Sequence, residues 1–425
     1  MNRKIKALIV LLSCLVVFYA VVGGMVGKET TAEGAYKQLQ VFSEVLLRIR
    51  NDYVEEPNLK QVSEGALRGV LESLDPYSSY LTPQEVAQMN GVAMKERGDI
   101  GVQISKRFGY INVVTAIPNS PADRAGLITS DIIEAINGVS TRDVSMQQAR
   151  MFFRGPVGAT VTLSVLRGQR ADPIKVDIIR EALPASPVES RMLEQSTGYI
   201  RISDLSSGKS QEVKKAVETV ERQGAKKLVL DVRDMASNDL EEAVAVANLF
   251  LDHGTIVSIE GQKYPKKTFV AEKSKAVSQL PLAVLMNRGS ASDAEVIASA
   301  ILENNRGDVI GERSYGIGSV QKLIPLEDGS AILLSVGKYF TPAGHLIQND
   351  KDLSKSGVLP NVVVKIDEDN SAALAQPIGE SEAAPADKGQ TKAGLPQKPR
   401  NQPDVILNKA LEVLREESAK EKKAA

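Results

Sequence analysis

The sequence predicts a multidomain α/β protein, and three observations lead to this prediction. The chain has 425 residues, enough for two or three globular domains with cores of their own. Between residues 97 and 181, short runs of alternating apolar and polar residues are separated by turn residues, which is typical of a β-rich module. From residue 184 to about 365, apolar runs of strand length alternate with helical stretches, which indicates a layered α/β domain.

The N-terminal segment predicts a membrane anchor. Arg3, Lys4 and Lys6 precede an apolar run over residues 7–26 that is long enough to span a bilayer. Positive charge before such a run keeps the N-terminus inside and exports the rest of the chain. We assign residues 1–27 to this signal or anchor, and favour an uncleaved anchor over a cleaved signal peptide. We therefore expect a cell-envelope protein, anchored in the inner membrane with a periplasmic or otherwise extracytoplasmic body.

The only cysteine, Cys14, lies within the same apolar run. A lipid attachment there is disfavoured, because the apolar residues continue after it. An exported body without cysteine has no disulfides and is held together by packing alone.

Residues 34–95 predict a small helical region. The apolar residues of "YKQLQVFSEVLLRIRNDYV" recur with helical spacing. The stretch "LDPYSSYLTPQE" interrupts them, and Thr82 is a candidate N-cap for a helix opened by Pro83 and Glu85. The β-rich domain then covers residues 96–182 and the α/β core residues 183–366.

The C-terminal part predicts a linker followed by a helix. Residues 367–403 are rich in Ala, Pro, Gly and charge and lack apolar periodicity, so we expect a flexible linker. Residues 404–421 form a helix whose apolar face carries Val405, Leu407, Ala410, Leu411 and Leu414. A short helix needs a packing partner, so this one either docks on the core or joins a second copy of the chain.

Composition excludes several function classes. Lys and Arg number 52 against 53 Asp and Glu, so bulk charge gives no reason to expect nucleic-acid binding. The chain has two histidines, His253 and His345, and no cluster able to build a zinc site. We therefore expect no metal and no cofactor.

The β-rich domain contains a candidate peptide-binding loop. The run Ile100-Gly101-Val102 predicts a loop whose free backbone amides cradle a carboxylate beside an open strand edge. Further on, "SPADRAGLITSDIIEAINGVS" resembles a PDZ domain, although Ser130 stands where that family usually has glycine. The resemblance implies a module that binds protein C-terminal tails. The alternative is a β-barrel module without a ligand.

A candidate nucleophile lies in "NRGSASDAEVIASAILENN". A strand ends at Asn287 and a helix begins near Asp293, which places Ser292 at a helix N-terminus. Backbone amides at such a point can stabilise the oxyanion formed in acyl transfer. Taken alone, a serine before a helix is more often an N-cap.

Together with "DPYSSYL", "YIRISDL", "LVLDVRD" and "YFTPAGHLIQ", these motifs run in order from about residue 34 to 365. The chain thereby resembles the carboxy-terminal processing peptidases, also called tail-specific proteases. The resemblance implies an exported serine endopeptidase with a PDZ domain inserted ahead of a crotonase-like α/β core. In that family the PDZ domain senses a C-terminal tail, a serine–lysine dyad cleaves it, and terminal helices mediate dimers.

The resemblance maps the family's nucleophile onto Ser292 and its acidic residue onto Glu295. The lysine base belongs to a "GKGxVQ" motif, whose flanks match Gly316, Gly318 and Gln321, but the base position holds Ile317. A serine hydroxyl is a poor nucleophile until a neighbouring base accepts its proton, and isoleucine cannot do so.

A second departure concerns the oxyanion region. The family usually carries "NNPGG" after its "DLR", whereas this chain has Ser237 and Asn238 in place of the two glycines. We expect the two side chains to restrict the backbone conformation that glycine supplies. The residue after the nucleophile is Asp293, whose amide can still contribute.

No other residue is an obvious replacement for the base. Lys322 follows Gln321 directly, so in a strand it faces the opposite side. The position of Lys338 cannot be judged from the sequence, and the resemblance gives His253 and His345 no role.

The first hypothesis is therefore a pseudo-peptidase, which cuts slowly or not at all. It binds either protein C-terminal tails or a paralogous peptidase that is active. The second is an active serine endopeptidase with a substitute base, supported by the retained Ser292, Glu295 and Gln321. A third, an assembly scaffold that dimerises through its N- and C-terminal helices, is compatible with the first, which we favour.

Overall fold

The computed structural model describes residues 36–90, 97–168, 172–183, 186–349, 351–365, 395 and 403–424. The chain divides into two units, Met1–Leu67 and Arg68–Ala425. In the first unit, residues 36–52 form a helix, and α2 (Leu59–Glu72) begins before the boundary. The first helix exposes several apolar side chains, namely Tyr36, Leu39, Val41, Val45 and Leu47.

The predicted anchor, residues 7–26, lies outside the described residues. Within the described ranges, no helix is both long enough and apolar enough to cross a membrane.

The segment that joins the helices to the β-rich domain contains one predicted element and one unpredicted one. The backbone amide of Thr82 donates to Glu85 Oε2 (2.7 Å), and the amide of Glu85 donates back to Thr82 Oγ1 (3.2 Å). This capping box starts α3 (Pro83–Asn90) and confirms the predicted cap. The three residues before Thr82, Ser79–Leu81, form strand β1 within the stretch that we expected to interrupt the helical spacing, and this strand was not predicted.

The β-rich domain is an antiparallel sheet with the strand order β3-β4-β5-β8-β9, and β6 pairs with β5. The strands are β3 (Val102–Arg107), β4 (Tyr110–Ala116), β5 (Ile132–Ile136), β6 (Val139–Ser140), β8 (Thr160–Leu166) and β9 (Ile174–Ile179). Two helices pack with it, α4 (Pro121–Arg124) and α5 (Met146–Phe153), together with the short 3₁₀ helix η2 (Thr141–Asp143). Strands β2 (Arg97–Gly98) and β7 (Gly155–Pro156) form a separate pair. The predicted strand runs are confirmed here.

The α/β core is built on a six-stranded sheet with the order β10-β11-β12-β15-β16-β19. Its strands are β10 (Glu189–Leu193), β11 (Thr197–Arg201), β12 (Lys227–Asp231), β15 (Leu282–Met286), β16 (Asp308–Gly311) and β19 (Val362–Val363). All neighbours are parallel except β10, which runs antiparallel to β11. Alternate residues of β12 and β15 enter two different apolar clusters, so both faces of the sheet are buried.

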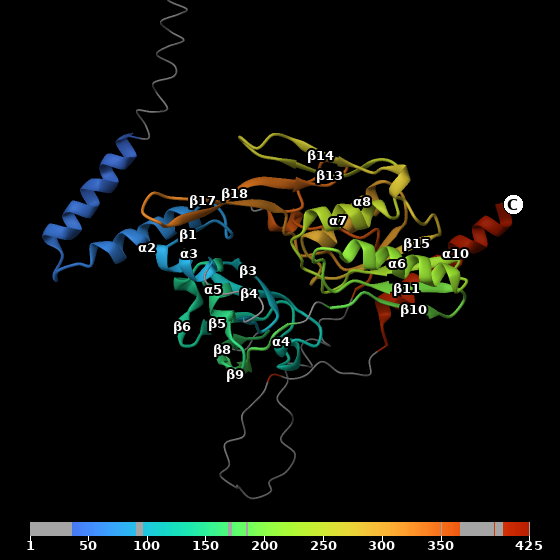
Figure 1. Ribbon diagram of the computed structural model, residues 1–425, viewed down its shortest axis with the longest axis horizontal. Coiled ribbons are helices and arrows are strands. Elements are labelled where there is room, and N and C mark those ends of the chain that lie inside the picture. The colour runs from blue at the N-terminus through green and yellow to red at the C-terminus, as the bar shows by residue number, and fades with distance from the viewer. Residues whose placement is uncertain are drawn as a thin grey trace, which may run out of the picture. The chain divides into compact units, whose positions relative to one another are not determined.

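A second sheet lies on the other side of the core helices. It contains β1, β13 (Thr255–Glu260), β14 (Lys267–Val270), β17 (Ser319–Pro325) and β18 (Ala331–Phe340), and every pairing in it is antiparallel. Helices α7 (Leu240–Asn248) and α8 (Asp293–Glu303) lie between the two sheets, while α6 (Lys209–Arg222) packs on β10 and β11 (Figure 1). Two short 3₁₀ helices, η3 (Lys273–Lys275) and η4 (Leu353–Lys355), lie in connections.

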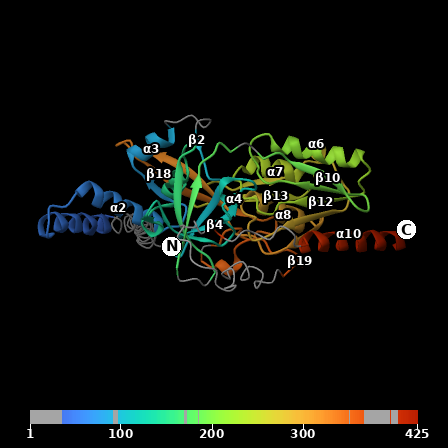
Figure 2. The ribbon, with the colours of Figure 1, turned by 90° about the horizontal axis from the view of Figure 1, so that it is seen from below.

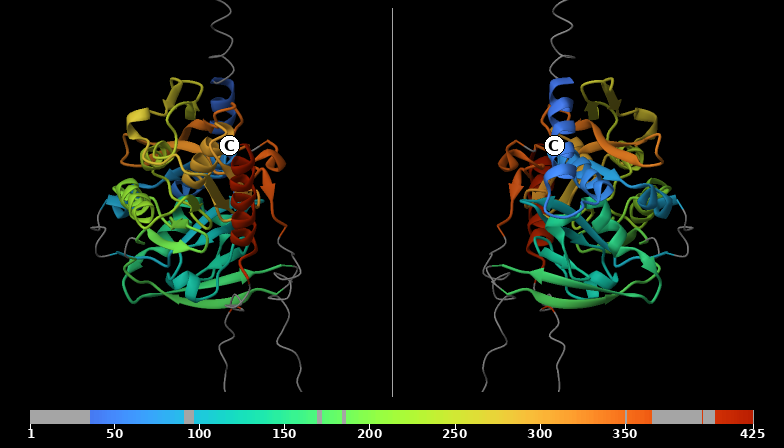
Figure 3. Two further views of the ribbon diagram at one scale, coloured as in Figure 1. Left: turned by 90° about the vertical axis from the view of Figure 1, so that its right-hand side faces the viewer. Right: turned by 90° about the vertical axis from the view of Figure 1, so that its left-hand side faces the viewer.

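The C-terminal helix α10 (Val405–Ala424) covers the second face of the six-stranded sheet. Figure 2 shows α6 above and α10 below strands β10 and β12, and the left panel of Figure 3 shows α10 in red along the core. Of the two alternatives for this helix, the structure therefore has it docked on the core of its own chain. The buried residues are Ile406, Ala410 and Leu414, whereas Val405 is 47% exposed, so its predicted place on the buried face is wrong.

An ion pair fixes the start of α10. The guanidinium of Arg233, at the end of β12, donates to both carboxylate oxygens of Asp404 (2.7 and 2.8 Å). The predicted linker, residues 367–403, lies outside the described residues apart from positions 395 and 403. Leu395 is 5% exposed and belongs to the apolar cluster of the β-rich domain.

Candidate functional site

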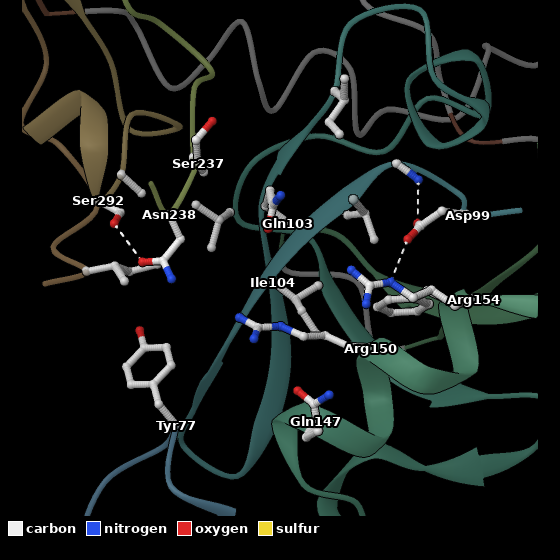
Figure 4. Close-up of a pocket in the computed structure, with 18 of the residues that line it drawn as sticks. Tyr77, Asp99, Gln103, Ile104, Gln147, Arg150, Arg154, Ser237, Asn238 and Ser292 are labelled. Atoms are coloured by element: carbon white, nitrogen blue, oxygen red, sulfur yellow. Dashed lines mark hydrogen bonds and ion pairs between the residues drawn. The ribbon is translucent and has the colours of Figure 1, made fainter. Parts of the chain in front are cut away.

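Ser292 lies at the turn between β15 and α8, with φ 54° and ψ −104°. A non-glycine residue rarely has such a backbone, and strain of this kind is often found at functional sites. The side chain is almost buried, at 4% exposure. Its Oγ donates a long hydrogen bond to Oδ1 of Asn238 (3.4 Å) (Figure 4). At the start of the helix that follows, the amides of Ala294 and Glu295 already donate to the carbonyls of Ala291 and Ser292 (3.3 and 3.0 Å).

Glu295 is a completely buried carboxylate that ties this turn to the loop before β17. Its Oε2 accepts from the amides of Ser292 and Ile317 (both 2.8 Å). Its Oε1 accepts from the Gly316 amide (2.7 Å) and from the Ser314 hydroxyl. Burial raises the pKa of Glu295 to about 7, although these four donors act in the opposite direction. The residue predicted as the family's acid therefore holds the loop that carries Ile317.

The glycines that flank Ile317 are required by close packing. Gly316 has φ +91°, and a Cβ there would lie 2.6 Å from Ser356 Cβ and 2.8 Å from the amide of Gly357. A Cβ on Gly318 would lie 2.9 Å from Ile347 Cβ. Both positions thus need glycine for the fold itself, whatever the chemistry at Ser292.

Ser237 and Asn238 occupy the loop between β12 and α7. The Ser237 hydroxyl accepts from the amide of Leu205 (2.7 Å) and donates to Asp204 Oδ1 (3.3 Å), so it is bound to a neighbouring loop of the core. Asn238 is exposed and contacts Ser292 through its side-chain oxygen. The positive φ in this loop is at Asp234 (55°), and neither Ser237 nor Asn238 has one. Neither residue therefore has the left-handed backbone that glycine adopts most readily, and the expected effect of the two side chains on an oxyanion donor stays a prediction.

Asp293, which follows Ser292, is fully buried. Its Oδ2 accepts from the amide of Asp239 (2.7 Å), while Oδ1 has no hydrogen-bond partner within the described part of the chain. Burial raises its pKa to about 7, and the nearby carboxylates of Asp239 and Asp204 act in the same direction.

In the predicted peptide-binding loop, one amide is already occupied. The amide of Gly101 donates to Asp99 Oδ1 (2.9 Å), and Asp99 Oδ2 pairs with Nε of Arg154 (3.1 Å) (Figure 4). Gly101 has φ +76°, and a Cβ would lie 2.3 Å from that of Ser120. The expectation of free amides is therefore wrong at Gly101, because a carboxylate of the chain itself takes its N–H.

One pocket of about 420 Å³ joins the loop to Ser292. Figure 4 shows Ser237, Asn238 and Ser292 on one side of it, Gln147, Arg150 and Arg154 on the other, and strand β3 between them. The sequence-predicted residues that line it are Gly101, Val102, Ser237, Asn238, Ser292, Ile317 and Gln321. Ile100 and Asp293 are buried and do not line it.

The pocket wall offers cations, and Asp99, the carboxylate among its described residues, is already paired with Arg154. Arg150, on α5, faces the pocket, and no carboxylate of the described residues pairs with it. Burial lowers the pKa of Arg150. Of the described residues that line the pocket, none is a lysine or a histidine. Lys322, His253 and His345 are exposed, and Lys338 is outside the wall.

Two contacts hold the β-rich domain against the core beside this pocket. The guanidinium of Arg107 stacks on the ring of Tyr315, 3.9 Å from its centre, and donates to the Tyr315 carbonyl (2.8 Å). The hydroxyl of Thr115 donates to the Asp234 carbonyl (3.4 Å). Asp99, Arg150 and Arg107 were not predicted from the sequence, because no local motif marks them. The ionic partner of Asp99 and the stacking partner of Arg107 lie far along the chain. Within the described residues, no cluster of His, Cys, Asp and Glu could hold a metal ion.

Comparison with known proteins gives a consistent assignment. Three family models match: Peptidase family S41 over residues 196–364, PDZ domain over 113–167, and Activating protease CtpB N-terminal domain over 22–85. The carboxy-terminal-processing protease of Bartonella bacilliformis is 32% identical over 399 residues, which cover 91% of this chain and 90% of the relative. The carboxy-terminal processing protease CtpA of Bacillus subtilis is 30% identical over 374 residues, covering 86% and 78%. Among solved structures, the photosystem II D1 C-terminal processing protease matches with a TM-score of 0.64 and 25% identity, covering 76% of this chain and 92% of that one.

Proposed function

Because the chain belongs to the carboxy-terminal processing proteases, serine peptidases that contain a PDZ domain, we propose that it binds protein C-terminal tails and cuts them slowly or not at all. The observation that supports slow or absent cleavage is the composition of the pocket wall around Ser292. No lysine or histidine is among the described residues that line it, and the wall includes Ile317, to which the motif resemblance assigns the position of the family's base. Without a proton acceptor, turnover in a serine protease falls by as much as about a millionfold.

The proposal that the chain binds C-terminal tails is supported by the continuity of the pocket. The same cavity reaches from the PDZ loop at Gly101 to Ser292, so a tail held by the PDZ domain would pass the serine. Because Asp99 occupies the Gly101 amide, the tail's carboxylate would meet the cation of Arg150 instead.

Some positions of the peptidase motif have a structural role, so their retention does not indicate that the chain is active. Glu295 holds four donors of two segments together, and Gly316 and Gly318 are needed for packing. These residues would be kept in a protein that never cleaves a peptide bond.

One observation favours a second candidate, a slow serine endopeptidase. The strained backbone at Ser292 places a hydroxyl in the pocket wall at a sharp strand-to-helix turn, which is where a nucleophile for acyl transfer would need to lie. Such an enzyme would need a substitute base from outside the residues described around the pocket.

A cleavage assay separates the two candidates. The purified full-length chain, Ser292→Ala and Ile317→Lys are each incubated with an unstructured test protein, and fragments are measured by mass spectrometry. We expect no Ser292-dependent cleavage by the unaltered chain. Cleavage that disappears in Ser292→Ala would establish the endopeptidase and reject the pseudo-peptidase. Activity gained in Ile317→Lys would show that the remaining site is intact, whereas its absence would implicate Ser237 and Asn238 as well.

The proposal includes an inner-membrane anchor at residues 7–26, an exported body and self-association through the N-terminal helix 36–52, whereas α10, the other helix expected to mediate dimers, packs on its own core. Its support is the apolar run behind Arg3, Lys4 and Lys6, together with the exposed apolar side chains of helix 36–52. Binding to an active paralogous peptidase is part of the same proposal. Digestion of the body by protease added to spheroplasts tests the export, and a body protected until lysis would contradict it.

A further inference from the structure

We propose that Ile317 forms an apolar subsite for a side chain of the bound tail, so that the position of the family's base serves binding in this chain. The inference rests on the proposed tail-binding function. Ile317 lines the pocket and, half-buried, packs against the apolar cluster of the PDZ domain. Its side chain therefore lies where the peptidase core meets the PDZ part of the pocket.

The structure holds this residue in one place. Its amide donates to Glu295 Oε2 (2.8 Å), and the preceding amide of Gly316 donates to Oε1 (2.7 Å). Gly316 and Gly318 on either side are packed too closely to accept a Cβ. A wall residue fixed in this way costs little ordering entropy when a ligand packs against it.

Charge and polarity then define the occupant. The pocket that contains Ile317 also contains the cation of Arg150, while the Gly101 amide is taken by Asp99. A peptide with a free C-terminal carboxylate and an apolar side chain near its end matches both features. Ile104 of β3 lines the same pocket and adds apolar surface to it.

The apolar contact sets the size of the expected effect. Burying about 50 Å² of apolar ligand surface against Ile317 corresponds to roughly tenfold in affinity over a polar residue of similar size. A polar side chain at position 317 would remove this discrimination and leave the carboxylate contribution unchanged.

The test uses the full-length chain and fluorescein-labelled Gly/Ser peptides with a free C-terminal carboxylate. Each peptide carries leucine or serine at one of its last five positions, and one set ends in an amide instead of an acid. Fluorescence anisotropy gives the Kd for the unaltered chain, Ile317→Ser, Ile317→Val and the control Ile317→Leu. We expect roughly tenfold tighter binding of leucine than of serine at one position, lost in Ile317→Ser, reduced in Ile317→Val and kept in Ile317→Leu.

The outcomes distinguish this inference from the function on which it rests. Leucine discrimination that is equal in the unaltered chain and in both Ile317→Ser and Ile317→Val would overturn the subsite but leave tail binding in place. Absence of binding to every peptide would reject tail binding and the subsite together.

Discussion

At the scale of single residues, the start of α8 contains two buried carboxylates, Asp293 and Glu295, which are two positions apart. Burial raises the pKa of Asp293 to about 7, from an ordinary 3.8, and raises that of Glu295 to about 7 as well. Between the ordinary and the raised values, the folded chain binds protons that the unfolded chain has released. The free energy of unfolding must then fall as the pH rises through this window.

We expect Asp293→Asn to flatten this pH dependence. Between about pH 4 and pH 7, the titration of Asp293 should lower the free energy of unfolding of the unaltered chain by as much as about 4 kcal/mol. In the variant, only the decrease due to Glu295 should remain. Urea unfolding at several pH values from about 5 to 8 measures the slope. The control is Asp252→Asn, because the pKa of that exposed carboxyl is lowered and its titration falls below the window. An unchanged slope in Asp293→Asn would contradict the assignment.

Residue identity at the site was predictable from local motifs, whereas its contacts were not. Ser292, Ile317 and Gln321 line the same pocket, as the resemblance implied. The occupied amide of Gly101 depends on Asp99, whose carboxylate is itself held by Arg154, 55 positions away. Long-range pairings of this kind leave no periodic signal in a sequence.

At the scale of elements, the apolar runs predicted β12, β15 and β16, because strands buried on both faces have no polar side to interrupt them. The parallel pairing order depends on contacts between distant segments and could not be derived. Strand β1, at three residues, is too short for a periodic pattern. The helix α10 was predicted. Its first turns carry apolar residues on more than one side, so the sequence did not determine which face packs on the core.

The buried face of α10 gives a matched pair of variants. Ile406 is 2% exposed and packs on the sheet, whereas the neighbouring Val405 is 47% exposed. We expect Ile406→Ala to lower the free energy of unfolding by about 2–4 kcal/mol, because it leaves a cavity, and Val405→Ala to lower it by less than about 1 kcal/mol. Denaturant unfolding measures both. A larger effect of Val405→Ala would place the other face of the helix on the sheet.

At the scale of the whole second unit, the PDZ domain and the peptidase core share one pocket wall, and Arg107 is a polar link between them. It contacts Tyr315, two residues before Ile317, across 208 positions of sequence. Neither domain alone contains all the residues of the pocket. The family resemblance therefore predicted a site, but the sequence of either domain did not predict how the two domains combine to form it.

We expect Arg107→Ala to loosen the loop that carries Ile317. Removing the stacked guanidinium and its hydrogen bond should increase amide exchange of residues 314–318 by about tenfold, which corresponds to the loss of about 1–2 kcal/mol. Hydrogen–deuterium exchange read by mass spectrometry checks this. Arg142→Ala is the matched control, because its guanidinium stacks on Tyr110 within the PDZ domain. Equal exchange in the two variants would show that Arg107 does not hold the loop.

The four hydrogen bonds to Glu295 also affect how such chains are identified in genomes. Selection for a folded protein is enough to keep this glutamate and the glycines around Ile317, even in a lineage where no substrate is ever hydrolysed. A search pattern that scores those positions does not separate active members of the family from inactive ones. The informative position is residue 317, on whose side chain our proposal of slow or absent cleavage rests.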